Sequence, residues 1–197
     1  MRKILTLFLM FFACIHAKSQ VEDYIQYTPA IANFALGACG IEHKHDTGDR
    51  IFLNLSSWAI MYGVTGTLKH EIKEERPDHS DMKSFPSGHA ARSFCGATIL
   101  AHEYGETSPW IAVAGYAIAT TTAVLRVTGD HHYTHDVIAG AAIGIASAEC
   151  SYLLLPTWQR LRKKWQKKNK SQSSDLSFFI APSLGINQTG LAGCLTF

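Results

Sequence analysis

The sequence has few charged residues for its length. They make up 17% of its 197 residues, against roughly 25% in an average soluble protein, whereas hydrophobic residues reach 47%. The formal net charge is only +2, so the total charge gives no indication of a nucleic-acid partner. The five cysteines include no Cys-x-x-Cys pair, and most lie in apolar segments, where we expect buried structural thiols. The composition leans towards contact with a membrane.

The first twenty residues have the pattern of an export signal. Arg2 and Lys3 precede an apolar run over residues 4–14, and small residues follow it. We therefore expect residues 1–19 to be a signal peptide. An uncleaved anchor is the alternative, although the run is short for a membrane span, which needs roughly 20 residues. Acylation of Cys14 is a further alternative, which the two preceding phenylalanines fit poorly.

Five apolar or semi-apolar stretches follow the signal, and all are longer than typical strands. They cover residues 28–39, 51–68, 88–103, 109–126 and 136–155. Their length and their content of Ala, Leu, Ile and Gly predict helices. The predicted fold class is therefore all-α, a helical bundle of about five to six helices that is membrane-embedded or membrane-associated, with its domain over residues 21–156. Arg92 and Glu149 argue against full spanning, because a charge at that depth is costly unless it is paired.

The remaining segment, residues 157–197, begins with a strongly basic run. Within it Trp158, Leu161 and Trp165 recur at helical spacing, which is typical of a helix lying on a membrane surface. A solvated helix end is the other interpretation. Residues 171–175 are expected to be a polar linker, and the sequence assigns no function to the last twenty residues.

Three polar clusters occur between the predicted helices, and the alternating helix directions place all three on one side of the bundle. They are Lys69-x6-Arg76-Pro77, then Pro86-Ser87-Gly88-His89, then Arg126-x5-His132-x3-Asp136. Each has an ordinary structural explanation on its own: a charged helix end, a helix cap, and a hydrogen bond between positions i and i+4. Their occurrence together and in this order indicates a catalytic site.

The three clusters supply what phosphoryl transfer requires. Its transition state spreads negative charge over three equatorial oxygens, so a site needs several fixed cations and donors around one point. Arg76 and Arg126 offer planar guanidinium groups, and Lys69 offers a point charge. The Ser87 hydroxyl and the backbone N–H groups near Gly88, at a predicted helix start, can also donate to an anion.

Two histidines can divide the covalent work. A neutral His132 ring is a competent nucleophile near neutral pH, and Asp136, one helical turn later, can fix its tautomer and stabilise the developing positive charge. His89 can protonate the departing alkoxide and then deprotonate the water that hydrolyses the phosphohistidine.

The three motifs resemble those of the type-2 phosphatidic acid phosphatase and vanadium haloperoxidase superfamily, over about residues 51–155. The resemblance implies a helical bundle, a phosphohistidine intermediate at His132 and an acid role for His89. It also implies that the phosphate is bound by Lys69, Arg76, Ser87, Gly88 and Arg126. One departure is Leu125, which stands where a serine usually precedes the arginine of the third motif. The loop between Pro77 and Pro86 is also short.

The sequence therefore predicts a metal-independent phosphatase, without a cofactor, that acts on a lipid-linked phosphate such as lipid A, undecaprenyl diphosphate, phosphatidic acid or phosphatidylglycerol phosphate. We expect it in the periplasm or at the periplasmic face of a bacterial inner membrane, with the membrane as a partner; oligomeric state is left open. The alternatives are a vanadate-dependent haloperoxidase and a non-catalytic scaffold or metal-binding protein. For the last, the candidate ligands are His43, His45, Asp46, His131 and His135.

Overall fold

The computed structural model describes residues 23–173, 177–185 and 188–196. The predicted signal peptide at 1–19 lies outside the described residues. The chain divides into two compact units, Met1–Leu155 and Pro156–Phe197. Each unit is described by itself.

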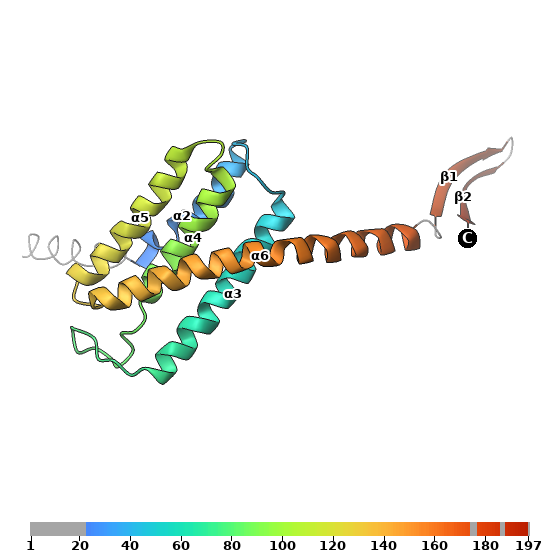
Figure 1. The fold of residues 1–197 in the computed structure, drawn as a ribbon. Coiled ribbons are helices and arrows are strands. Elements are labelled where there is room, and N and C mark those ends of the chain that lie inside the picture. Colours follow the sequence, from blue (N-terminus) through green and yellow to red (C-terminus); the bar gives the residue numbers. More distant parts are fainter. Residues whose placement is uncertain (1–22, 174–176, 186–187, 197) are drawn as a thin grey trace, which may run out of the picture. The chain divides into compact units, whose positions relative to one another are not determined.

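The first unit is a bundle of helices, shown in Figure 1. Its elements are α2 (Thr28–Ala38), α3 (Thr47–Glu71), α4 (Gly88–Tyr104), α5 (Pro109–Thr128) and the first part of α6 (Thr134–Ser173). Each of the five stretches that were predicted to be helical forms one of these helices. The prediction of an all-α bundle is therefore confirmed for this unit.

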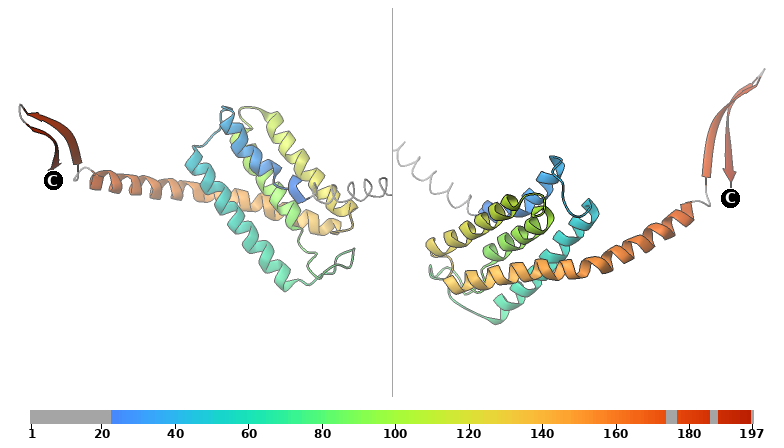
Figure 2. Two further views of the ribbon diagram at one scale, coloured as in Figure 1. Left: turned by 180° about the vertical axis from the view of Figure 1, so that it is seen from behind. Right: turned by 45° about the horizontal axis from the view of Figure 1, so that its top comes forward.

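Helix α4 is the centre of the bundle. It packs against α2, α3 and α5. The views in Figures 1 and 2 show α5 and α3 on opposite sides of it. Helix α6 approaches α4 through Gly140 and Gly144, where an added methyl group would overlap the carbonyl oxygens of Ser87 and Ala91. Larger side chains at these two glycines would therefore push the start of α6 away from the start of α4.

Side-chain caps define where the helices begin. Asp46 precedes α3, and its carboxylate accepts a hydrogen bond from the backbone N–H of Asp49 at 3.0 Å. Ser87 precedes α4, and its hydroxyl oxygen accepts one from the N–H of Ala90 at 3.4 Å. Each cap satisfies a backbone donor that the helix itself leaves unpaired. The second cap also fixes Ser87 and Gly88 at the start of α4.

Among the described residues, three helices are long and apolar enough to cross a membrane: Thr47–Glu71, Pro109–Thr128 and Thr134–Asn169. Large apolar side chains on all three are exposed, such as Leu55, Val113 and Leu153. The two charged side chains that argued against spanning both have hydrogen-bond partners. Arg92 donates to the side chain of Gln26 at 2.6 Å, and Glu149 lies 2.8 Å from the ring of His102.

The described cysteines differ in burial. Cys95 is buried in the core, as expected, but Cys39 and Cys150 are exposed. The expectation of a buried thiol is therefore wrong at these two positions, because apolar neighbours along a helix do not reveal which face the helix turns outward. All three are free thiols.

The second unit begins inside α6, which continues through Pro156 to Ser173. The basic run, for which a membrane-surface helix and a solvated helix end were the two interpretations, is helical and continuous with the apolar stretch over residues 136–155. The linker expected at residues 171–175 is wrong in its first residues, which are helical through Ser173. One proline removes a single backbone donor, whereas the run after it is rich in strong helix formers. Strands β1 (Ser177–Gly185) and β2 (Gln188–Thr196) then pair as an antiparallel hairpin, which the sequence analysis did not anticipate.

Candidate active site

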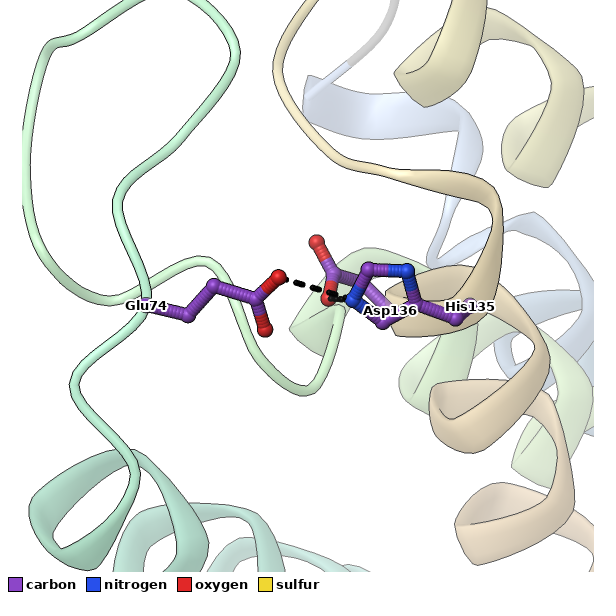
Figure 3. A group of neighbouring side chains, drawn as sticks. All are labelled: Glu74, His135 and Asp136. Carbon is purple, nitrogen blue, oxygen red and sulfur yellow. Dashed lines mark hydrogen bonds and ion pairs between the residues drawn. The ribbon is translucent and has the colours of Figure 1, made fainter.

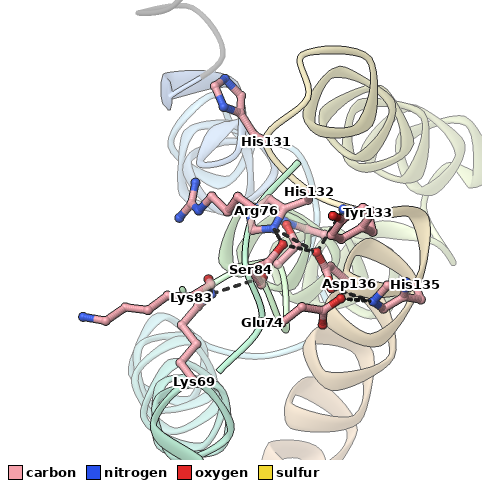
Figure 4. Close-up of polar contacts among 12 residues, drawn as sticks. Lys69, Glu74, Arg76, Lys83, Ser84, His131, His132, Tyr133, His135 and Asp136 are labelled. Atoms are coloured by element: carbon pink, nitrogen blue, oxygen red, sulfur yellow. Dashed lines mark hydrogen bonds and ion pairs between the residues drawn. The ribbon is translucent and has the colours of Figure 1, made fainter. Parts of the chain in front are cut away.

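The residues of the three motifs lie at one end of the bundle. Figure 4 shows part of this cluster, which draws on the end of α3, the loop over residues 72–87 and the segment that leads into α6. The first turn of α4 and the last turn of α5 reach the same end. The helix directions inferred from sequence are therefore correct here, and side chains more than 60 residues apart come together.

His132 and Asp136 form the buried centre of this cluster. Their side chains are 2% and 0% exposed, and His132 Nδ1 lies 3.4 Å from Asp136 Oδ2. The same carboxylate oxygen accepts a hydrogen bond from the backbone N–H of Tyr133 at 2.9 Å. Because Nδ1 faces the carboxylate, the other ring nitrogen, Nε2, lies on the opposite side of the ring. A neutral ring with its proton on Nδ1 would present the Nε2 lone pair to a substrate.

Ser84 is a member of this centre that the sequence analysis missed. Its side chain is fully buried, and its hydroxyl donates to Asp136 Oδ2 and lies 3.5 Å from His132 Nδ1. Ser84 therefore helps to hold the carboxylate that faces the histidine. Its position just before Pro86-Ser87-Gly88-His89 was the only available signal, and a lone serine in a loop carries little information.

The loop over residues 72–87 brings the first motif to the site. The N–H of Ser84 donates to the carbonyl of Glu74 at 3.0 Å, which closes the loop. The Nζ of Lys69 donates to the Lys83 carbonyl at 2.7 Å. Arg76 Nε donates to the Asp81 carboxylate at 2.9 Å. Asp81 thus orients the guanidinium group of Arg76, a role that the sequence alone did not indicate.

The pKa of His132 is lowered from 6.5 to about 4 by burial first and then by the nearby cations Arg76, Lys69 and Arg126, against the opposite effect of Asp136. The ring is therefore neutral at physiological pH, as a nucleophile must be. The same three cations lie near enough to this ring to act on its charge.

His89 lies in the first turn of α4, and its Nε2 is 3.1 Å from a carboxylate oxygen of Asp23. Its pKa is also lowered to about 4, by burial first and then by the charges of Arg126 and Arg92, against the opposite effect of Asp23. In the protein without substrate, His89 is therefore also neutral near pH 7. A bound phosphate would offset the positive charges and favour a proton on His89.

The start of α4 completes the arrangement. The N–H of Ser87 donates to the backbone carbonyl of Asp136 at 3.0 Å, so the second and third motifs are joined directly. A methyl group at Gly88 would meet the side chain of Arg92 at 3.5 Å, which is ordinary contact. The packing of the protein alone therefore does not require glycine there.

Residues 51–160, more than half of the chain, match the PAP2 superfamily. The chain belongs to this superfamily. PAP2 relatives include the lipid A 1-phosphatase of Porphyromonas gingivalis, 33% identical over 135 residues, and a PA-phosphatase related-family protein of Dictyostelium discoideum, 32% identical over 137 residues. The family resemblance drawn from the three motifs is thus confirmed.

These alignments cover 68% and 57% of this PAP2 chain, but 30% and 51% of the two relatives. The chain therefore spans about half or less of the length of these relatives. Among solved structures, LpxE of Aquifex aeolicus is similar with a TM-score of 0.54 and 22% identity, over 66% of this chain and 82% of that one. This similarity shows a shared fold.

One group in the PAP2 site has the composition of a metal centre. Glu74, His135 and Asp136 place their ligand atoms within 4.8 Å of one another (Figure 3). His135 Nε2 lies 2.8 Å from Glu74 Oε1 and 3.2 Å from Asp136 Oδ1. These distances are those of a hydrogen-bonded ion pair, so the contacts are explained without a metal. The pair links the loop of the first motif to α6.

The five residues considered as an alternative metal site do not come together. His131 lies 3.0 Å from Asp78 and His135 lies beside Glu74, both at the site end. His45 lies 2.9 Å from Glu103, near the other end of α4. The histidines of that alternative thus belong to opposite ends of the bundle, as the helix directions indicated.

Proposed function

We propose that this chain is a metal-independent phosphatase that hydrolyses a lipid-linked phosphate through a phosphohistidine at His132. The observation that carries the proposal is the neutral His132 ring, backed by the Asp136 carboxylate and flanked by three cations. A phosphate attracts those cations, and the ring between them is a nucleophile. Membership of the PAP2 superfamily supports the same chemistry.

The proposed reaction has two steps. His132 Nε2 attacks phosphorus, the bond from phosphorus to the ester oxygen breaks, and His89 gives its proton to the departing alkoxide. His89 then removes a proton from water, the resulting hydroxide attacks phosphorus, and the phosphorus–nitrogen bond breaks. Inorganic phosphate leaves, and His132 is neutral again. Asp136 stabilises the positive charge that the ring carries in the intermediate.

The phosphate is proposed to lie among the remaining motif residues. Arg76 and Arg126 each have the fork geometry that suits two phosphate oxygens, and Lys69 adds a point charge. The backbone N–H groups of Gly88 and its neighbours point from the start of α4, where anions are favoured. A side chain in place of Gly88 would occupy the position where the phosphate approaches the backbone.

A lipid substrate follows from the setting of the site. Three helices of this bundle have the length and composition of membrane spans, so a headgroup at their ends would reach the site while its acyl chains stay in the bilayer. The lipid A 1-phosphatase among the relatives supports the same substrate class. With an export signal at residues 1–19, the domain at 21–156 would face the periplasm from a bacterial inner membrane, followed by the segment 157–197.

Phosphate release by the purified full-length protein tests this proposal. The panel would contain lipid A, undecaprenyl diphosphate, phosphatidic acid, phosphatidylglycerol phosphate and a soluble ester, all with EDTA. We expect release from at least one lipid, inhibition by vanadate, and no release by the His132→Ala variant. Oxidation of halide by peroxide with vanadate, without any phosphate release, would instead indicate the haloperoxidase alternative.

A further inference from the structure

A hollow of about 550 Å³ lies beside the site, on the side of α3. It is lined by Gly66, Lys69, His70, Lys73, Met82 and Lys83. Four of these six residues carry basic nitrogen atoms, and none carries a carboxylate. A hollow of this size lies in the range of small-ligand pockets, and its lining favours an anion.

The backbone holds the two outer lysines close together. An isolated parallel bridge pairs Glu74 with Lys83, so Lys73, the neighbour of Glu74, lies near Lys83. Both lysine side chains are exposed and free to turn towards a ligand. The nearby carboxylate of Asp81 accepts hydrogen bonds from Arg76 Nε at 2.9 Å and from the N–H of Lys83 at 2.8 Å. That carboxylate is thus already engaged with the loop's own donors.

Lys69 connects the hollow to the site. It lines the hollow, and it is also one of the cations that act on the His132 ring. An anion in the hollow and the phosphate under attack would therefore both lie within reach of the Lys69 side chain. Figure 4 shows Lys69 and Lys83 side by side at this edge of the site. The hollow also lies at the end of α3, a candidate membrane span, and a lipid headgroup would lie at this end if α3 crosses the bilayer.

We propose that this hollow is a subsite for a second phosphate group of the same substrate, held by Lys73 and Lys83. The inference rests on the proposed function and narrows its substrate class to lipids whose headgroup carries two phosphates. Such a headgroup is either a diphosphate or a saccharide phosphorylated at two positions. A lipid with a single phosphate leaves the hollow empty and binds more weakly.

Binding to a protein that cannot turn over tests the subsite directly. The full-length His132→Ala protein in nanodiscs would be titrated with three lipids: a diphosphate, a saccharide lipid with two phosphates, and a lipid with one phosphate. We expect at least one lipid of the first two kinds to bind about tenfold more tightly than the third, as two charge-assisted contacts allow. The lipid that binds more tightly identifies the arrangement of the two phosphates.

The double change Lys73→Gln/Lys83→Gln in the same background should remove that preference, whereas Lys44→Gln, at the other end of α4, should retain it. Thermal unfolding would check that all variants are folded, which their exposed positions favour. Equal affinity for all three lipids, or a preference that survives the double change, would overturn the subsite. Phosphate release by the wild-type protein is measured separately from binding. If no phosphate were released, the proposed function would be contradicted, but the binding result would still hold.

Discussion

Two pairs of a histidine and a buried carboxylate lie at opposite ends of α4, and they differ in what surrounds them. His132 lies beside Asp136 at the start of the helix, and His45 lies beside Glu103 near its end. Glu103 is 2% exposed and also accepts from the Tyr152 hydroxyl at 2.8 Å and from the His45 N–H at 3.1 Å. A phenol, a ring and a backbone group thus satisfy this carboxylate, in an arrangement that stabilises the fold.

The surroundings of His132 are different, because its neighbours are cations. Arg76, Lys69 and Arg126 all lower its pKa, and the nearby hollow adds further basic residues. A pair of histidine and carboxylate is therefore not by itself a sign of catalysis. The excess of positive charge around the ring distinguishes the proposed site, and it is also what a phosphate would neutralise.

The largest expected difference between the two pairs concerns the histidines. His132→Ala should lower kcat by about a thousandfold or more, because the nucleophile is lost. His45→Ala should leave kcat of the folded protein unchanged and lower its stability by about 1–3 kcal/mol, since Glu103 loses a partner. Phosphate release and thermal unfolding of both variants would measure this. Equal and mild losses of kcat would contradict the assignment.

The carboxylates give a smaller contrast. Asp136→Asn should lower kcat by about 10²-fold, less than the loss of the nucleophile, because the amide neither fixes the ring tautomer nor stabilises its charge. Glu103→Gln should change kcat little. Circular dichroism would verify that both proteins are folded. A larger loss of kcat in Glu103→Gln than in Asp136→Asn would show that the choice of site is wrong.

The pH dependence of the reaction is a further test of the site at the start of α4. With the pKa of both His132 and His89 lowered to about 4, the proton that His89 passes to the leaving group must arrive with the substrate, as its phosphate monoanion, whose second pKa is about 6. We expect kcat/KM to be bell-shaped, falling below about pH 4 as His132 is protonated and above about pH 6 as the monoanion is lost. An acid limb near 6.5 would contradict the burial of His132.

The same shifts affect stability. The unfolded chain takes up protons on these histidines near pH 6.5, whereas the folded protein does so only near 4. Protons therefore favour the unfolded state in this window, and stability should fall as the pH falls from 6.5 towards 4. Replacement of His132 by Gln should reduce this slope in denaturant titrations, and an unchanged slope would oppose the assignment.

The smallest expected effect concerns metal. EDTA should leave the rate unchanged, because the contacts of Glu74 with His135 are those of an ion pair. His135→Ala should then lower kcat by a few-fold at most, through a looser link between the loop of the first motif and α6. Loss of activity in EDTA, restored by a divalent cation, would show that the group holds a metal.

Most of the motif residues could be placed from sequence because they lie next to a helix end; Arg76, within the loop over 72–87, is the exception. Ser87 caps α4, and Asp136 follows His132 by one helical turn, so local patterns carried the information. Ser84 and Asp81 were missed because their roles depend on how the loop over 72–87 closes on itself. Such contacts are tertiary and leave no period or spacing in the sequence.

The most direct test of the central claim is to trap the phosphoenzyme. Loss of His89 removes the acid of the first step as well as the base of the second, so the wild-type and His89→Ala proteins would both be used. Each would be mixed with a lipid labelled in the phosphate, quenched in base at times from milliseconds to minutes, and digested. The account predicts a base-stable, acid-labile label on the peptide that contains His132, and no label when His132 is also replaced. Label on another residue, or turnover in wild type without any phosphoenzyme, would contradict it.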